Sequence, residues 1–476
     1  MDHTLLISLI VAAFYLMGIL SVINAVMTTR TSQGAIAWVV SLITFPFIAV
    51  PAYWVFGNSR FNGYIKARNS SSEEIEKILE SMLHGLNPYH LKKSERVPKA
   101  TAVEKLVDLP FLSHNRVELL IDGKEVFASI LEGISRAESY ILFQFYIVHD
   151  DKIGKEVQSA LIRKAKEGVT VHFLYDEIGS HDLGKAYKEE MLNAGIYVHS
   201  FHTQQGKGNR FQLNFRNHRK VVVIDGKSTW IGGLNIGDEY LGRNEKVGNW
   251  RDTHMKIIGP AAIAAQVSFV EDWHWATGGN IPELKWEPKA SLGGDAKILI
   301  LPSGPADDLE TASLMFLHVI SSAKERIWIA TPYFVPDNAI LYALQLAILR
   351  GVDVRILIPD KADNLLVNLS FYTFLDDPNL QGVHFFRYTD GFLHEKVMLV
   401  DSRVAAVGTA NFDNRSFRLN FEITGLVADD KFIKEVEMMF LNDFTRARST
   451  GREAMDAKPF WFKLLARLAR LTSPVQ

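Results

Sequence analysis

The chain has 476 residues, of which 47% are hydrophobic and 22% charged, and its 52 Lys and Arg residues are balanced by 54 Asp and Glu residues. This length predicts two or three domains with a large core, and the composition excludes a disordered or fibrous chain. The net charge of −2 excludes a generally cationic nucleic-acid binder. Because the chain contains no cysteine, disulfides, Cys-ligated metals and cysteine catalysis are excluded as well.

The first predicted elements are two uncharged hydrophobic runs within residues 1–57. The run 5–27 exceeds the roughly 20 residues that a helix needs to cross the hydrocarbon core, and the apolar part of the second run covers 35–56. The short connection TTRTSQ predicts an antiparallel transmembrane hairpin with both ends on one side of the membrane. A cleaved signal peptide is disfavoured, because Asp2 and His3 stand where a basic region is expected.

Two prolines leave the form of the second hydrophobic run open. Pro46 and Pro51 favour a kinked or partly re-entrant helix, so one full crossing followed by a half-inserted hairpin is the alternative to two crossings. The second run is followed by three basic residues, whereas the connecting loop contains Arg30 alone. The three are Arg60, Lys66 and Arg68. The positive-inside rule therefore places the rest of the chain in the cytoplasm.

Two amphipathic helices are predicted on either side of the main body. In the linker 58–104, Ser71 and Glu74 have the spacing of a capping box and would start the first helix. Its apolar face would consist of Ile75, Ile78, Leu79, Met82 and Leu83. The second helix lies in 451–476, with an apolar stripe of Trp461, Leu464, Leu465, Leu468 and Leu471 opposite Lys463, Arg467 and Arg470. This pattern predicts a helix in the headgroup plane of an anionic membrane, with a helix docked on the body as the alternative.

The body contains one structural plan twice. Each copy has a helix, an apolar strand, a second helix and a strand opened by Gly-Val. In the first copy, the first helix end and strand lie at 134–148 and the Gly-Val strand lies at 168–176. In the second copy, the matching segments are 320–335 and 351–360. Strands this apolar should be covered by helices on both faces. We therefore expect an α/β fold of two similar lobes, each a mixed sheet flanked by helices, at 105–280 and 296–450, with 281–295 as the connector.

Each half later contains the same chemical pattern of His, Lys, Asp and Asn at relative positions 0, +2, +7 and +17. The residues are His218, Lys220, Asp225 and Asn235, then His394, Lys396, Asp401 and Asn411. A single match would be a weak signal, but two copies in matched halves are a strong one. A His and a Lys separated by one residue point to the same face of a strand. Two facing halves would therefore surround one phosphodiester with two imidazoles, two ammonium groups and two amides.

Paired histidines suit phosphodiester exchange. One neutral imidazole attacks phosphorus, and the other protonates the leaving alkoxide and later deprotonates the incoming hydroxyl. The Lys and Asn pairs would stabilise the charge on the non-bridging oxygens, so neither a metal nor another cofactor is required. Asp252 and Glu422 follow the two motifs and are candidates to hold the other ring nitrogen of a histidine. Asp225 and Asp401 lie far along the strand, which favours a structural role at a turn.

The duplicated motifs resemble those of the phospholipase D superfamily, and the segments 45–57, 331–336 and 417–422 are similar to bacterial cardiolipin synthases. The resemblance implies condensation of two phosphatidylglycerols into cardiolipin and glycerol, without a cofactor, by a multi-pass protein of the bacterial inner membrane with cytoplasmic lobes. It assigns catalysis to His218, Lys220, Asp225, His394, Lys396 and Asp401, with His218 as the nucleophile and His394 as the general acid and base. It assigns substrate binding to Asn235, Asn411, Gly233 and Thr409.

The resemblance also implies supporting carboxylates. Glu422, 28 residues after His394, matches the acidic residue that holds a histidine in relatives, and Asp252, 34 residues after His218, matches more loosely. Gly233 and Thr409 occupy the position where many members have Ser. A hydroxyl contact to the phosphate is therefore expected only in the second half.

Several alternatives remain open at this point. They are phospholipase D hydrolysis, transfer to another alcohol or to phosphatidylethanolamine, and a membrane scaffold that binds anionic lipid without turnover. A nuclease is disfavoured, because two hydrophobic runs and a near-neutral charge suit lipid better than nucleic acid. The expected partners are phosphatidylglycerol and other anionic lipids, and a homo-oligomer is possible.

Overall fold

The computed structural model describes residues 3–57, 60–69, 80, 82–91, 100–203, 214–245 and 248–476. Most of the predicted linker helix, including Ser71, Glu74, Ile75, Ile78 and Leu79, lies outside these residues. Within the described part of this region, Met82 is buried in the main core, whereas Leu83 is exposed.

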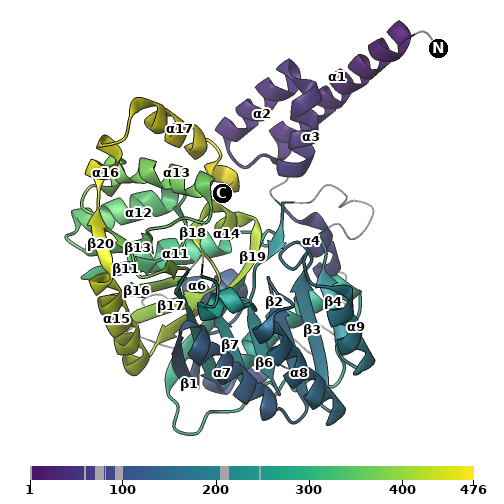
Figure 1. Ribbon diagram of the computed structural model, residues 1–476, viewed down its shortest axis with the longest axis vertical. Helices are drawn as coiled ribbons and strands as arrows, with labels where there is room; N and C mark the ends of the chain where they lie inside the picture. Colours follow the sequence, from purple (N-terminus) through teal and green to yellow (C-terminus); the bar gives the residue numbers. More distant parts are fainter. Residues whose placement is uncertain are drawn as a thin grey trace.

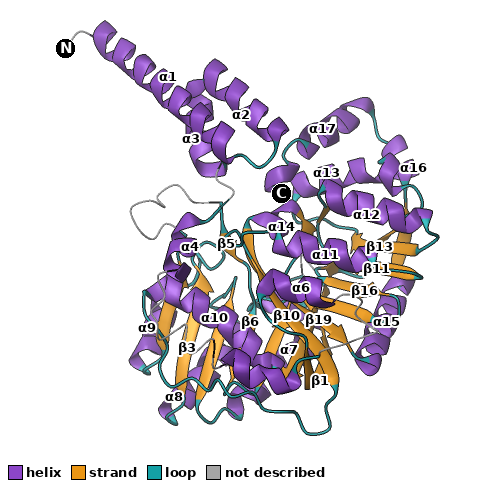
Figure 2. Ribbon diagram, turned by 180° about the vertical axis from the view of Figure 1, so that it is seen from behind, coloured by secondary structure: helices purple, strands orange, loops and turns teal. Residues whose placement is uncertain are grey.

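One continuous sheet of 16 strands runs through both halves of the body (Figures 1 and 2). Its strands in the first half are β1 (Leu112–Ile121), β2 (Tyr140–Phe145), β3 (Thr170–Asp176), β4 (Tyr197–Phe201), β5 (Arg216–Asn217), β6 (Val221–Ile224), β7 (Ser228–Gly232) and β9 (Thr253–Ile258). Those in the second half are β10 (Ala296–Ser303), β11 (Arg326–Ala330), β13 (Asp353–Pro359), β14 (His384–Tyr388), β16 (Val397–Val400), β17 (Val404–Gly408), β19 (Asn420–Ala428) and β20 (Ala447–Thr450). Four short strands form two separate pairs, β12 (Phe334–Val335) with β18 (Phe412–Asp413) and β8 (Trp250–Arg251) with β15 (Phe392–Leu393).

The strand order shows that the two halves are copies related by a pseudo-twofold axis. The order is β4-β3-β2-β6-β7-β9-β1 in the first lobe and β14-β13-β11-β16-β17-β19-β10 in the second, and the antiparallel pair β1–β10 joins them. In each lobe the two strands of the predicted repeat pair in parallel, β2 with β3 and β11 with β13, while the motif strand pairs antiparallel to the first of them. The expected fold class is confirmed.

Helices cover this sheet because its strands are apolar on both faces. The first lobe contributes α7 (Asp122–Ser135), α8 (Lys152–Lys166), α9 (Lys185–Asn193) and α10 (Ala261–Thr277). The second lobe contributes α11 (Thr311–Ser321), α12 (Asn338–Leu349), α13 (Leu365–Leu375), α14 (Asn414–Arg418) and α15 (Asp430–Thr445). Before the first strand stands α6 (Ala100–Val107). The segment between α10 and β10 contains neither a helix nor a strand.

The N-terminal hydrophobic region forms three helices, α1 (His3–Thr28), α2 (Ser32–Thr44) and α3 (Pro46–Phe56), followed by α4 (Asn62–Asn69). Among the described residues, α1 alone is long and apolar enough to cross a membrane. The second hydrophobic run is not one continuous spanning helix. Pro46 occupies the first turn of α3, and the chain turns between α2 and α3 at Phe45.

The C-terminal segment contains α16 (Arg452–Asp456) and α17 (Phe460–Arg470), and α17 docks on α13 (Figure 1). Ala466 and Ala469 are buried in this contact, whereas all five residues of the predicted apolar stripe are exposed. Two of the basic side chains that lie opposite the stripe pair with carboxylates of the body. Arg470 binds Asp377 at 2.8 Å, and Arg467 lies 3.9 Å from Asp376.

Candidate active site

Each motif histidine is held by the backbone of the opposite lobe. Strand β5, which leads into the first motif, pairs in parallel with β19 of the second lobe, and the His218 N–H donates to the Phe421 carbonyl at 2.9 Å. Strand β15, which leads into the second motif, pairs with β8 of the first lobe, and the His394 N–H donates to the Arg251 carbonyl at 2.8 Å. The lobes are therefore interlocked at the histidines.

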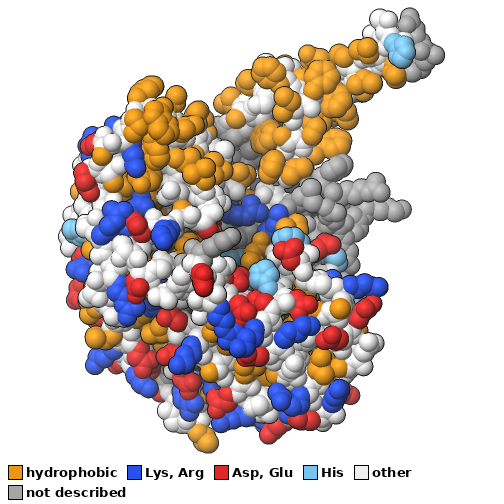
Figure 3. Space-filling model, viewed as in Figure 1, with side chains coloured by type: hydrophobic (Ala, Val, Ile, Leu, Met, Phe, Trp, Pro, Cys, Tyr) orange, Lys and Arg blue, Asp and Glu red, His pale blue; other side chains and the backbone are white. Residues whose placement is uncertain are grey.

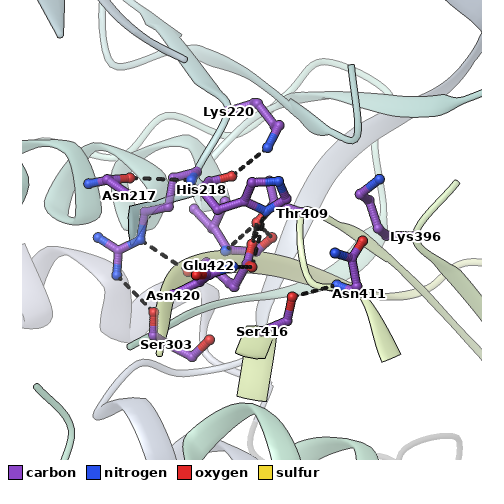
Figure 4. Close-up of polar contacts among 12 residues, drawn as sticks. Asn217, His218, Lys220, Ser303, Lys396, Thr409, Asn411, Ser416, Asn420 and Glu422 are labelled. Atoms are coloured by element: carbon purple, nitrogen blue, oxygen red, sulfur yellow. Dashed lines mark hydrogen bonds and ion pairs between the residues drawn. The ribbon is translucent and has the colours of Figure 1, made fainter. Parts of the chain in front are cut away.

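The supporting carboxylates also cross between the lobes. Nδ1 of His218 lies 2.9 and 3.0 Å from the two carboxylate oxygens of Glu422 (Figure 4). Nδ1 of His394 lies 2.8 Å from Oδ2 of Asp252. The pairing within each half, which the sequence order indicated, is wrong. It fails because β8 and β19 each pair with the strand that leads into the motif of the opposite lobe. Asp252, which follows β8, therefore meets His394, and Glu422 in β19 meets His218.

The electrostatics give both histidines the same tautomer. Burial would raise the pKa of Asp252 and of Glu422, but the nearby histidines and lysines outweigh it, so both pKa values lie below the ordinary range and both groups are ionised. Burial lowers the pKa of His218 and of His394 to about 4. Each neutral ring must donate its Nδ1 proton to the carboxylate, which leaves Nε2 unprotonated and able to attack phosphorus.

The two lysines converge on the same region. Lys220 Nζ donates to the His218 carbonyl at 2.7 Å, and Lys396 Nζ donates to the His394 carbonyl at 2.5 Å. Burial lowers the pKa of Lys220, and the charge of Lys396 lowers it further. Burial lowers the pKa of Lys396 to about 8, so this ammonium group is mainly protonated at neutral pH. An anion bound by both buried lysines would favour their charged ammonium forms.

The two asparagines differ, although the sequence predicted equal roles. The Asn235 carboxamide is engaged by the protein, since its Oδ1 accepts from the Ile147 N–H and its Nδ2 donates to the Tyr240 hydroxyl, both at 3.1 Å. By contrast, Oδ1 of Asn411 is buried and has no hydrogen-bond partner within the described parts of the chain. Asn411 lies near Lys396 in Figure 4. Its carboxamide is thus the better placed of the two to meet a substrate.

The second residue of each Gly-x-x-Asn turn lies against a supporting carboxylate. The Thr409 hydroxyl donates to Glu422 and accepts from the Ile423 N–H, so in this structure its proton is engaged by the carboxylate and not free for the expected contact with the phosphate. At the matching position, a Cβ on Gly233 would lie 2.1 Å from Oδ1 of Asp252. The absence of a side chain at Gly233 therefore makes room for the Asp252 carboxylate.

The motif aspartates lie outside this group and anchor the backbone. Asp225 accepts hydrogen bonds from the N–H groups of residues 138–140, and Asp401 accepts from those of residues 324–326. Both adopt a left-handed conformation, with φ of 54° and 53°. They fix the turn before β2 and β11 in the two lobes. This geometry supports the structural role and corrects their placement among the catalytic residues.

Buried ion pairs that the sequence did not single out hold the two motif strands. Arg219 donates to the Glu422 carbonyl at 3.0 Å and to Asp272 at 2.9 Å. At the matching position, Glu395 accepts from Arg251 at 2.8 Å and from the Thr253 hydroxyl at 2.7 Å. The only signal for these pairs in the sequence was that Arg219 and Glu395 alternate with the His and Lys of each motif.

Aromatic side chains flank the histidines and were also missed. The Tyr146 ring centroid lies 5.0 Å from that of His218, and Lys220 Nζ lies 5.3 Å from the same tyrosine ring. The Trp250 ring centroid lies 5.1 Å from that of His394. These rings help to bury the imidazoles, which explains the direction of their pKa shifts.

Known protein families and their members match most of this chain. The family described as "Cardiolipin synthase, PLD-like domain" matches residues 130–258 and 316–444, which contain the two motifs, and the family "Phospholipase_D-nuclease N-terminal" matches residues 13–58. The chain is 46% identical over 466 residues to cardiolipin synthase A of Pseudomonas putida strain W619, covering 97% of this chain and 96% of the relative. It is 43% identical over 475 residues to cardiolipin synthase A of Pseudomonas fluorescens strain SBW25, covering 99% and 98%.

A solved structure shares the fold. The crystal structure of phosphatidylserine synthase from Haemophilus influenzae Rd KW20 aligns with a TM-score of 0.61 and 18% identity, over 79% of this chain and 100% of that chain. At this identity the likeness concerns the architecture of the two lobes.

Proposed function

Because the chain belongs to the cardiolipin synthase family of phospholipase D-like proteins, we propose that it condenses two phosphatidylglycerols into cardiolipin and glycerol through a phosphatidyl-histidine intermediate. The observation that carries this proposal is the crossed pairing of His218 with Glu422 and of His394 with Asp252. It would provide two neutral imidazoles, each with an unprotonated Nε2 atom, in one site formed by both lobes. The two lysines would hold the phosphate between them.

In the first step, Nε2 of His218 attacks the phosphorus of one phosphatidylglycerol. A P–N bond forms and the P–O bond to the headgroup glycerol breaks, and the glycerol oxygen takes a proton from His394. His394 is neutral in the free protein, with a pKa of about 4. A bound phosphodiester anion beside the ring raises that pKa, so substrate binding charges the acid. Lys220 and Lys396 stabilise the non-bridging oxygens.

In the second step, a glycerol hydroxyl of another phosphatidylglycerol attacks the same phosphorus. His394 accepts the hydroxyl proton, the P–N bond breaks and His218 returns to its neutral form. The new P–O bond completes cardiolipin. Both histidine side chains are about nine-tenths buried, with 11% exposure each, so bulk water has little access to the intermediate.

The membrane setting follows from the apolar helix α1 and the matched N-terminal family. We place the protein in the bacterial inner membrane with its lobes in the cytoplasm, because Arg60, Lys66 and Arg68 follow the hydrophobic region. The chain has a net charge of −2, which favours lipid over nucleic acid as its partner.

Incubation of the purified protein with phosphatidylglycerol alone tests the proposed reaction. The expected products are cardiolipin and glycerol in equal amounts, because each turnover transfers one phosphatidyl group and releases one headgroup. Phosphatidic acid with glycerol would instead identify a hydrolase. If phosphatidylethanolamine or another alcohol, added in a parallel incubation, outcompetes phosphatidylglycerol as the acceptor, the assignment of the acceptor is wrong.

The C-terminal helix α17 extends the proposed membrane contact. Its small residues face the body, while Trp461, Leu464 and Leu468 are each about half exposed or more. Figure 3 shows hydrophobic side chains of this region and of α1–α3 at the same end of the molecule. A docked helix can thus lie in the headgroup plane and keep its apolar stripe toward lipid.

Spin labels on single cysteines test this placement, since the chain contains no cysteine of its own. In proteoliposomes of full-length protein, a label at Leu464→Cys or Leu468→Cys is expected to collide more often with dissolved oxygen than with an aqueous nickel complex. A label at Leu292→Cys, which replaces a loop residue that is 97% exposed, is the matched control and should show the reverse. Aqueous behaviour at both helix positions would show that α17 stays clear of the bilayer.

A further inference from the structure

Both ends of the α2–α3 pair lie at the catalytic body. Arg30, in the turn between α1 and α2, forms an ion pair with Glu310, which also binds Arg418 at 3.1 Å. Beyond α3, the Phe61 N–H donates to the Pro305 carbonyl at 3.0 Å. Helix α2 therefore leads away from the body, and α3 returns to it.

Neither helix of this pair is long enough to cross a membrane. With 13 residues, α2 spans about 20 Å, and with 11 residues α3 spans about 17 Å, against a hydrocarbon core of about 30 Å. Helix α1 has 26 residues and spans about 39 Å. The three helices thus provide one crossing segment and two half-length segments.

Contacts with α1 show how deep the turn between α2 and α3 reaches. A Cβ on Gly18 would lie 2.8 Å from the Leu42 carbonyl oxygen and 3.5 Å from Pro46 Cβ, so the turn packs against Gly18. Gly18 is ten residues from the end of α1 at Thr28, which is about 15 Å along the helix and half of the core. Beyond the turn, residues 3–13 of α1 are exposed and extend away from the body (Figures 1 and 2).

The turn itself is suited to hydrocarbon. The Phe45 N–H donates to the Ser41 carbonyl at 2.9 Å, and the N–H groups of Ile48 and Ala49 donate to the Phe45 carbonyl at 3.1 and 2.9 Å. Pro46 has no N–H to satisfy. The side chains of Phe45 and Ile48 are largely exposed. Exposed apolar side chains are unfavourable in water and favourable in hydrocarbon, and the paired backbone groups of the turn meet the requirement of a bilayer interior.

The charge distribution agrees with this depth. The first 29 residues contain neither Lys nor Arg. The basic residues Arg30, Arg60 and Arg68 form ion pairs with the body, and Lys66 lies in α4, which contacts α10 of the body. Two full crossings would put Arg30 on the opposite side from the other three. One crossing puts every basic residue on the side of the body, as the positive-inside rule prefers.

From these observations we infer that α1 crosses the bilayer once, that α2 and α3 form a half-inserted hairpin beside it, and that the start of α1 lies on the membrane side opposite to the catalytic lobes. The partner of the exposed α1–α3 surface is thus the lipid bilayer, and Figure 3 shows its hydrophobic covering. This topology goes beyond the proposed reaction, and its test requires no turnover.

Single-cysteine labelling with a membrane-impermeant maleimide tests the inference in the full chain. The positions are Thr4→Cys, Ser32→Cys, Phe45→Cys and, as the body reference, Leu292→Cys. Labelling is compared between spheroplasts, which are cells stripped of the outer membrane with an intact inner membrane, and inside-out vesicles of the inner membrane. A circular-dichroism spectrum that matches that of the unsubstituted protein verifies that each variant is folded.

The expected pattern separates the two topologies at Ser32. Ser32→Cys and Leu292→Cys should label only in inside-out vesicles, Thr4→Cys only in the stripped cells, and Phe45→Cys in neither until detergent is added. Two crossings would instead expose Ser32→Cys on the side opposite to Leu292→Cys and put Thr4→Cys on the same side as Leu292→Cys. Either of those results overturns the inference. Ready labelling of Phe45→Cys by the impermeant reagent in either preparation would also overturn it.

Discussion

Replacement of His218 by alanine is expected to lower kcat for cardiolipin formation by about 10⁴-fold or more, because the covalent intermediate can no longer form. Replacement of His394 by asparagine should cause a loss of the same order, since it removes the acid and base. Because the two residues act as a unit, the double variant should be little worse than either single variant. The measurement is conversion of phosphatidylglycerol by reconstituted protein.

An exposed histidine of the first lobe provides the matched control. The His181 side chain is 71% exposed, and His181→Ala should retain wild-type turnover. If His218→Ala kept more than a tenth of wild-type activity while His181→Ala behaved normally, the nucleophile would have to be another group. A full loss in His394→Asn with a normal rate in His218→Ala would make His394 the nucleophile.

Removal of the charge from either supporting carboxylate should be nearly as damaging. Glu422→Gln and Asp252→Asn are expected to lower kcat by about 10²- to 10⁴-fold with little change in KM, because an amide no longer fixes the tautomer of the histidine or stabilises its charged form. Gly233→Ala should resemble Asp252→Asn, since its Cβ would lie 2.1 Å from Oδ1 of Asp252. Asp295→Asn, at an exposed carboxylate, is the control.

The crossed pairing can be checked separately from the rate. In protein labelled with ¹⁵N-histidine, Glu422→Gln should shift the Nδ1 signal of His218 and leave that of His394 in place, with the signals assigned through His218→Ala. Asp252→Asn should do the opposite. The reverse pattern would restore the pairing within each half and would contradict the interlocked lobes.

Much of this structure could be predicted from the sequence, because the same pattern of elements occurs in both halves of the chain. The apolar strands opened by Gly-Val predict β3 and β13, and the spacing of His218 with Lys220 and of His394 with Lys396 predicts one face of each motif strand. The distance of Asp225 and Asp401 from the histidines correctly indicates a structural role, since both bind backbone N–H groups at the far end of the strand.

Other features depend on contacts between segments far apart in the chain. Glu422 reaches His218 across 204 residues, because β5 pairs with β19, and no local pattern encodes that pairing. The difference between Asn235 and Asn411 arises from a backbone contact, because Oδ1 of Asn235 accepts from the Ile147 N–H, whereas Oδ1 of Asn411 is buried without a hydrogen-bond partner among the described residues. Pro46 signals a break in the second hydrophobic run, but the direction in which α2 runs from the body depends on Arg30 meeting Glu310.

The number of phosphatidyl groups per chain tests the central claim most directly. Protein is mixed with phosphatidylglycerol labelled in its phosphate, quenched in base to preserve phosphohistidine, digested and mapped by mass spectrometry. One shared site predicts at most one phosphatidyl group per chain, found on the peptide that contains His218 and absent from His218→Ala. Two groups per chain, one on each histidine, would show that the lobes work as separate sites and would contradict the account.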